Sequence, residues 1–154
     1  MIYIDIDGVC VDFVGTAKEF GVELEHNEFG VWKWGEPITP AEFYAVAEPQ
    51  EWLDLLLEWI NEADCFGLNF LTIDNSEVKR KWIEDNIENP LGYPYISVYE
   101  APDKSVHCEH PTDLLIDDNA AECERWRDKG GIAYWFNLAE DDPFGKFLKW
   151  WRLK

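Results

Sequence analysis

Basic residues are scarce in this chain of 154 residues, which has 13 Lys and Arg against 32 Asp and Glu. The formal net charge is therefore −19, and the sequence pI is near 4.3. Nucleic-acid binding depends on Lys and Arg that neutralise phosphates, so this balance argues against a nucleic-acid polymer as a partner. A small anionic ligand is still compatible with it, provided that a metal and a few local cations offset the negative field.

Cysteine and long apolar runs are sparse as well. The four cysteines, Cys10, Cys65, Cys108 and Cys123, form no CxxC pair, so the sequence predicts neither a disulfide framework nor a zinc ribbon. No run approaches the ~18 apolar residues that a membrane-spanning helix needs. The first residues also lack a basic leader followed by an apolar stretch. We therefore expect a cytoplasmic protein that has no membrane partner.

The rest of the composition is that of an ordinary globular domain, with 47% hydrophobic and 29% charged residues. Along the chain, short apolar runs alternate with segments of helical periodicity. The expected strands are 2–6, 66–71, 95–99, 114–116 and 132–136, and the expected helices include 40–46, 52–63, 75–87, 119–130 and 142–151. This alternation predicts an α/β fold, with a Rossmann-like five-stranded parallel sheet and helices on both faces.

Two local details accompany this prediction. In the helix at 52–63, the periodicity places Leu55 on the buried face together with Leu56 and Ile60. At the start of the helix near 119, Asn119 and Glu122 have the spacing of a capping box.

The stretch 16–50 differs from the rest of the chain, because glycines and prolines are scattered among short segments of helical periodicity. We predict a core of residues 1–15 and 51–154, with 16–50 inserted as a small, mainly helical cap over the site. Aromatic rings gather in this insert, and Trp32, Trp34 or Phe43 could stack on a nucleobase. The alternative is that these rings form the small core of the insert itself.

Polar residues follow the strands at their carboxyl ends, where open parallel sheets bind ligands. These residues are Asp5 and Asp7 after the first strand, Thr72 after the second, Asp117 and Asp118 after the fourth, and Lys104 in the loop before the fourth. Crowded carboxylates repel each other unless a cation lies between them. Carboxylates, a hydroxyl and an ammonium on one rim favour phosphoryl transfer at a metal site.

Four of these positions resemble known motifs. Residues 5–13, DIDGVCVDF, are similar to the first motif of haloacid dehalogenase-like phosphatases, DxDGVxxDF. Phe70-Leu71-Thr72 resembles the second motif, Lys104 the third, and LLIDD at 114–118 the fourth. The strongest resemblance is to the 5'(3')-deoxyribonucleotidases and their bacterial and phage relatives. Those proteins share the first motif, and they carry a lysine within the pattern DK[TS]V shortly before the pattern DLLIDD. In this chain the corresponding residues are DKSV at 103–106 and DLLIDD at 113–118.

One departure from that branch concerns the second motif. It usually continues Thr-Ser/Ala-Pro, whereas this chain has Thr72-Ile73-Asp74. The insert after the first motif is also shorter and richer in Trp. The identity of the substrate is therefore left open.

The resemblance implies a role for each carboxylate. Asp5 would attack phosphorus and form an aspartyl-phosphate intermediate, while Asp7 would protonate the leaving oxygen and then deprotonate the hydrolytic water. Mg²⁺ would be held by the Asp5 carboxylate, the Asp7 backbone carbonyl and Asp117, with Asp118 binding directly or through water.

The remaining motif residues would bind the phosphate. Thr72 and the amide of Ile73 would contact its oxygens, and Lys104 would offset charge on the phosphate and the nucleophile. The resemblance thus implies a magnesium-dependent phosphatase, monomeric or homodimeric, that acts on (deoxy)nucleoside monophosphates. A phosphatase for another small monoester such as a sugar phosphate, and a catalytically idle binding module, are the alternatives.

A phospho-accepting receiver domain is a further alternative, because it also places Asp residues, Thr and Lys around magnesium. Receivers carry their acidic pair after the first strand and the acceptor Asp after the third. Here the candidate acceptor Asp5 comes first and an acidic pair follows the fourth strand, so the order of the motifs disfavours a receiver.

Overall fold

The computed structural model describes residues 1–20, 25–26, 32–33, 39–63, 67–87 and 96–154. Its elements are β1 (Ile2–Ile4), α1 (Phe13–Glu19), β2 (Glu25–His26), β3 (Trp32–Lys33), α2 (Pro40–Val46), α3 (Leu53–Ala63), β4 (Leu68–Thr72), α4 (Ser76–Asn86), β5 (Ile96–Glu100), the 3₁₀ helix η1 (Lys104–His107), β6 (Leu114–Asp117), α5 (Ala120–Asp128), β7 (Ile132–Trp135) and α6 (Pro143–Arg152).

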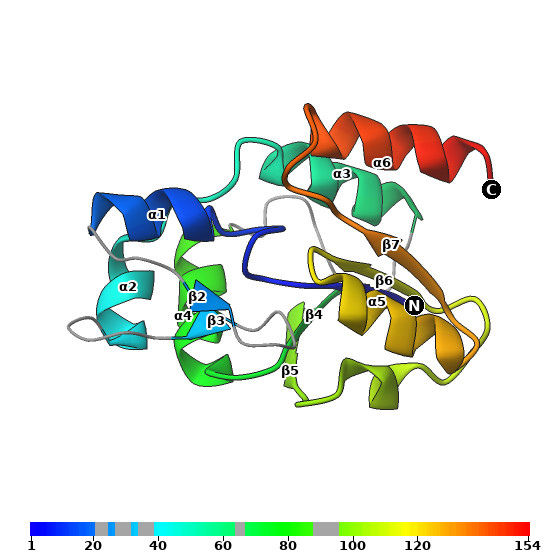
Figure 1. Ribbon diagram of the computed structural model, residues 1–154, viewed down its shortest axis with the longest axis horizontal. Helices are drawn as coiled ribbons and strands as arrows, with labels where there is room; N and C mark the ends of the chain where they lie inside the picture. Colours follow the sequence, from blue (N-terminus) through cyan, green and yellow to red (C-terminus); the bar gives the residue numbers. More distant parts are fainter. Residues whose placement is uncertain (21–24, 27–31, 34–38, 64–66, 88–95) are drawn as a thin grey trace.

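Five of the strands form one parallel sheet in the order β5-β4-β1-β6-β7 (Figure 1), which confirms the predicted architecture. From β1 the chain first adds β4 and β5 on one side, and then β6 and β7 on the other. The strand order therefore reverses between β1 and β6, and ligands bind outside the carboxyl ends of strands at such a switch point. Counted within this sheet, the order is 3-2-1-4-5, whereas receivers have 2-1-3-4-5, so a receiver is excluded.

Successive side chains of the strands point to opposite faces of the sheet and so belong to two separate core layers. Ile2 and Ile4 belong to the larger layer, which contains the buried faces of α3, α4 and α6. Tyr3 points to the opposite face, where it meets Trp126 of α5 at a ring-centroid distance of 5.4 Å. Figure 1 shows α3 and α6 together on one side of the sheet and α5 on the other. Helices thus cover both faces, as predicted.

The insert leaves and rejoins the core at one place. The Asp12 N–H donates to the Glu48 carbonyl at 2.8 Å, and the Gln50 N–H donates to the Cys10 carbonyl at 2.8 Å. Between these ends lies α2, which packs against α1 and α4 (Figure 1). The insert also holds β2 and β3, which pair antiparallel. The sequence predicts a mainly helical insert, and this strand pair is not among the expected elements.

The predicted burial of α3 needs one correction. Leu55 is 55% exposed, while Leu53 and Leu57 are buried. The buried face is therefore rotated from the one predicted, because α3 packs on the sheet through Leu53, Leu56, Leu57 and Ile60. Leu55 instead borders a shallow depression between α3 and α6.

The predicted capping box at the start of α5 is only half formed. The Asn119 side chain accepts from the N–H groups of Ala121 and Glu122, as an N-cap residue should. The Glu122 carboxylate does not reach back to the Asn119 N–H: one of its oxygens accepts from Arg125, and the other is buried without a hydrogen-bond partner. That N–H donates to the Asp117 carboxylate at 2.9 Å instead.

Candidate active site

A buried lysine joins the ends of the two central strands. The register pairs Ile4 of β1 with Ile116 of β6, so the next residues, Asp5 and Asp117, emerge side by side. The Lys104 ammonium donates to Asp5 Oδ1 and to Asp117 Oδ2 at 2.7 Å each. Exposed fractions of 7% for Asp5, 2% for Lys104 and 0% for Asp117 mean that these charges interact away from bulk water. The structure therefore brings together three of the predicted site residues.

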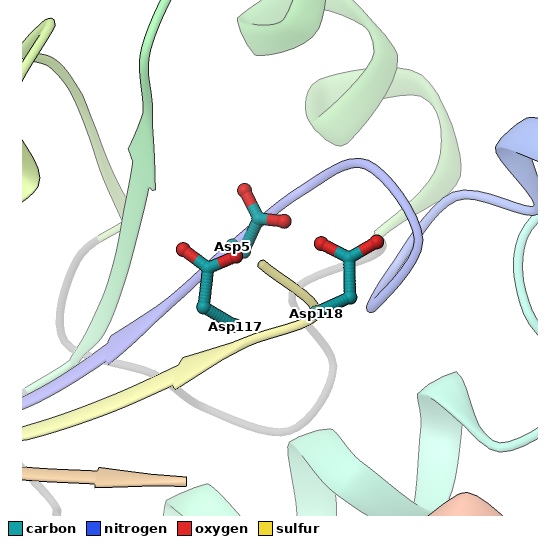
Figure 2. A group of neighbouring side chains, drawn as sticks. All are labelled: Asp5, Asp117 and Asp118. Atoms are coloured by element: carbon teal, nitrogen blue, oxygen red, sulfur yellow. The ribbon is translucent and has the colours of Figure 1, made fainter. Parts of the chain in front are cut away.

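Asp118 completes a group of three carboxylates at this edge. Figure 2 shows the carboxyl groups of Asp5, Asp117 and Asp118 close together where β1 and β6 end. One oxygen from each residue lies within 4.8 Å of the others. Hard oxygen donors from a few carboxylates are what Mg²⁺ binds, and each carboxylate can accept more than one contact. The donor set therefore fits the expected metal.

The pKa values of these groups reveal an excess of negative charge. Burial raises the pKa of Asp117 to about 7, and the nearby Asp5 adds to the effect. Burial and the same Asp5 hold the pKa of Asp118 well above its usual range. Burial opposes ionisation of Asp5 too, but Lys104 outweighs it and lowers the Asp5 pKa. A divalent cation would relieve this crowding by stabilising the ionised forms.

Lys104 itself is held in its charged form. Burial alone would lower its pKa, but Asp117 and Asp5 outweigh burial and raise the pKa above the usual range. The position of the side chain is fixed by η1, which begins at Lys104 and is capped by Asp103. The Asp103 carboxylate accepts from the Ser105 N–H at 3.0 Å. Lys104 can therefore supply a permanent positive charge beside the candidate nucleophile.

Asp7 lies in a different neighbourhood from Asp5. The hydroxyl of Tyr44 donates to Asp7 Oδ1, and the Lys79 ammonium lies 2.8 Å from Asp7 Oδ2. Burial, followed by the charge of Asp7, raises the pKa of Tyr44 well above its usual range, so its hydroxyl remains a donor. The Asp7 carboxylate is thus held from two sides, by a helix of the insert and by a helix of the core.

The turn directly after Asp7 requires glycine. Gly8 has a φ of 84°, a conformation that residues with a side chain rarely adopt. An added Cβ would also stand 2.2 Å from the Asp118 carboxylate. Gly8 therefore allows the loop after β1 to approach the end of β6.

Lys79 was not predicted from the sequence as a site residue, and neither was Tyr44. The Lys79 ammonium donates to Thr72 Oγ1 at 2.7 Å and to the Asp74 carboxylate at 2.9 Å, in addition to its ion pair with Asp7. A signal was available, because Lys79 precedes Trp82 and Ile83 by three and four residues. On a helix this spacing places it on the same buried face.

Thr72 stands at the predicted place, at the end of β4, but its hydroxyl is already engaged. It donates to the Asp74 carbonyl at 3.1 Å and accepts from Lys79. Ile73, whose amide was expected to bind phosphate, follows directly and is partly buried. The strand end therefore carries a hydroxyl and an ammonium in direct contact.

The aromatic residues predicted to stack on a base are placed as follows. Phe43 is 1% exposed and packs against Phe13 with ring centroids 4.8 Å apart. Its ring has no face open to a nucleobase, so this candidate is wrong and the residue belongs to the core. Trp32 lies in β3, but its side chain falls outside the described parts of the structure, and Trp34 lies outside the described residues altogether.

No protein-family model and no curated protein sequence matches this chain. Among solved structures, a haloacid dehalogenase-like family hydrolase from Streptococcus pneumoniae superposes over 97% of this chain and 97% of its own. The TM-score is 0.54 at 17% sequence identity. This chain has the haloacid dehalogenase-like fold. No helix among the described residues is long and apolar enough to cross a membrane.

Proposed function

We propose that this protein is a magnesium-dependent phosphomonoesterase of the haloacid dehalogenase-like superfamily, with Asp5 as the nucleophile. The observation that carries the proposal is the pairing of Lys104 with both Asp5 and Asp117 at the switch point of the sheet. A lysine there offsets the charge of a bound phosphate and keeps Asp5 ionised for attack. The haloacid dehalogenase-like fold supports the same type of hydrolysis.

In the first step, an oxygen of Asp5 attacks phosphorus and forms a new P–O bond. The bond between phosphorus and the leaving oxygen breaks, and its electron pair stays with that oxygen. Asp7 gives a proton to the leaving oxygen, so the alcohol departs in neutral form. The products of this step are the alcohol and an aspartyl-phosphate.

In the second step, Asp7 takes a proton from water as the water oxygen attacks phosphorus. The P–O bond to Asp5 breaks, the carboxylate is restored and inorganic phosphate is released. A bound Mg²⁺, held by Asp5, the Asp7 carbonyl and Asp117 with Asp118 nearby, would neutralise charge on the phosphate oxygens. Lys104 and the end of β4 at Thr72 would bind those oxygens from the protein side.

For the substrate we propose a (deoxy)nucleoside monophosphate. The support is the sequence of residues 103–106 and 113–118, DKSV and DLLIDD, which resembles the deoxyribonucleotidases. The burial of Phe43 removes one of the three rings considered for base stacking and favours the alternative, another small monoester such as a sugar phosphate.

The test is a panel of phosphate monoesters assayed for released phosphate with Mg²⁺. We expect turnover that stops with a chelator and returns with Mg²⁺. Asp5→Asn should lower turnover by at least ~10³-fold, since the amide is a poor nucleophile of nearly the same shape. The matched control is Asp54→Asn on the exposed face of α3, which should keep wild-type turnover. No turnover on any monoester would favour the idle binding module, and undiminished turnover by Asp5→Asn would refute the mechanism.

The panel also tests the substrate. Nucleoside monophosphates should show a higher kcat/KM than sugar phosphates and p-nitrophenyl phosphate. A sugar phosphate with the highest kcat/KM would replace the nucleotide proposal while leaving the phosphatase proposal intact. Trp32→Leu should raise KM for a nucleotide and spare p-nitrophenyl phosphate if that ring stacks on the base.

A further inference from the structure

The site contains a second buried ammonium that the mechanism above does not use. Lys79 is 2% exposed, and three acceptors surround its nitrogen: Thr72 Oγ1 at 2.7 Å, Asp7 Oδ2 at 2.8 Å and Asp74 Oδ1 at 2.9 Å. An ammonium has three protons to donate, so each contact can take one. Burial would lower the pKa of Lys79, but Asp7 and Asp74 outweigh it and raise the pKa.

The two buried lysines reach the catalytic edge from opposite faces of the sheet. Lys79 extends from α4, whose buried face belongs to the larger core layer with Trp82. Lys104 extends from η1 on the other face, where His107 lies 6.0 Å from the ring of Tyr3. Lys104 joins the nucleophile to the metal ligands, whereas Lys79 joins Asp7 to the end of β4. The two groups therefore have separate tasks.

The contact with Asp74 gives a reason for the unusual second motif. Thr72-Ile73-Asp74 replaces the Thr-Ser/Ala-Pro expected from the resemblance, and the replaced position supplies a carboxylate for Lys79. The same turn accepts a hydrogen bond from Thr72 through the Asp74 carbonyl. Burying an ammonium is costly unless it is paired and hydrogen-bonded, and these partners satisfy that requirement.

We propose that Lys79 is a positioning residue for Asp7. By binding Asp7, Thr72 and Asp74 at once, its ammonium fixes the Asp7 carboxylate relative to the phosphate-binding end of β4. A carboxylate that gives a proton to a leaving oxygen must lie within hydrogen-bonding reach of it, and small displacements of such groups are costly. This inference rests on the proposed phosphatase function.

Substrates with different leaving groups can distinguish a role of Lys79 in positioning Asp7 from other roles of Lys79. An alkyl phosphate needs a proton on its poor leaving oxygen, whereas p-nitrophenyl phosphate has a good leaving group and needs little protonation. A defect that acts through Asp7 should therefore lower kcat/KM mainly for the alkyl ester. A phosphate-binding role or general damage to the fold would lower kcat/KM for both esters alike.

The experiment compares Lys79→Met with Lys81→Met, a matched change at an exposed lysine of the same helix. Both are assayed with Mg²⁺ on a nucleoside monophosphate and on p-nitrophenyl phosphate. We expect Lys79→Met to lower kcat/KM by about 10²-fold for the nucleotide and by under about 10-fold for the aryl ester. Lys81→Met should change neither ester by more than about twofold.

A second variant keeps the test valid should Lys79→Met fail to fold. Asp74→Asn removes one partner of Lys79 at a side chain that is 45% exposed, and it should produce a smaller loss with the same bias toward the nucleotide. Equal losses on both esters in the soluble variants, or none, would overturn the role of Lys79. Wild-type protein that hydrolyses no monoester of the panel would instead refute the phosphatase proposal itself, so the two failures are distinct.

Discussion

At the scale of single residues, the site is a problem of charge balance. Asp5, Asp7, Asp74, Asp117 and Asp118 lie around Lys79 and Lys104, so the carboxylates outnumber the ammonium groups by three. The shift of the Asp117 pKa to about 7 expresses the same imbalance, because burial and the neighbouring Asp5 favour the protonated form. One divalent cation would offset two of these three excess negative charges.

Binding of that cation should therefore stabilise the fold independently of turnover. We expect MgCl₂ at about 100-fold above its dissociation constant to raise the free energy of unfolding by about 2.7 kcal/mol. Asp117→Asn should lose most of this increment, because it removes a charged ligand from the site. The measurement is thermal or urea unfolding with and without MgCl₂ at matched ionic strength. An equal increment in wild type and variant would place Mg²⁺ elsewhere.

Part of this site could be predicted because the order of the motifs and the ends of the strands can be recognised in the sequence alone. Asp5, Lys104 and Asp117 were identified and do meet. Lys79 was missed, since a lysine on a charged helix is expected at the surface, although its spacing from Trp82 indicated burial. Tyr44 was missed because nothing local reveals a hydrogen bond to a residue 37 positions away.

At the scale of elements, α2 connects the insert to the chemistry. Its Tyr44 donates to Asp7, and its C-terminal end is fixed by α4, where the Trp82 indole N–H donates to the Ala47 carbonyl at 2.9 Å. The insert therefore takes part in holding a candidate catalytic group.

Tyr44→Phe tests this connection with a change of one oxygen. Loss of the hydroxyl leaves the Asp7 carboxylate with one donor fewer, and we expect kcat/KM for a nucleoside monophosphate to fall about 10-fold. Tyr99→Phe, at a 37% exposed tyrosine of β5, is the matched control and should keep wild-type kcat/KM. Activity of Tyr44→Phe equal to wild type would mean that α2 merely packs beside the site.

Element types were predictable where the hydrophobic period was long and the caps were clear. The five strands and α2 fall at or within about two residues of the predicted ranges. The buried face of α3 was predicted wrongly at Leu55, because periodicity alone does not say which of two adjacent apolar stripes meets the sheet. The β2–β3 pair was not predicted, because strands of two residues are too short to show an alternating pattern of apolar residues.

At the scale of the whole molecule, the net charge of −19 destabilises the folded state through repulsion between like charges. Screening shortens the range of this repulsion from ~30 Å at 0.01 M salt to ~8 Å at 0.15 M. We therefore expect NaCl over this range to stabilise the fold by on the order of 1 kcal/mol, which raises Tm by about 2–4 °C. The measurement is the Tm from thermal unfolding at 0.01 M and 0.15 M NaCl, without Mg²⁺. A fall in Tm with salt would show that attractive ion pairs dominate.

The junction of insert and core has a consequence for how such a protein can change. Cys10, Asp12, Glu48 and Gln50 are joined by backbone hydrogen bonds that close the base of the insert. Residues added between Asp12 and Glu48 lengthen a closed loop, and the entropy cost of loop length grows only slowly. The strand ends that carry Asp5 and Asp117 need not move when this happens. Changes in the length of the insert are therefore compatible with an unchanged placement of Asp5 and Asp117.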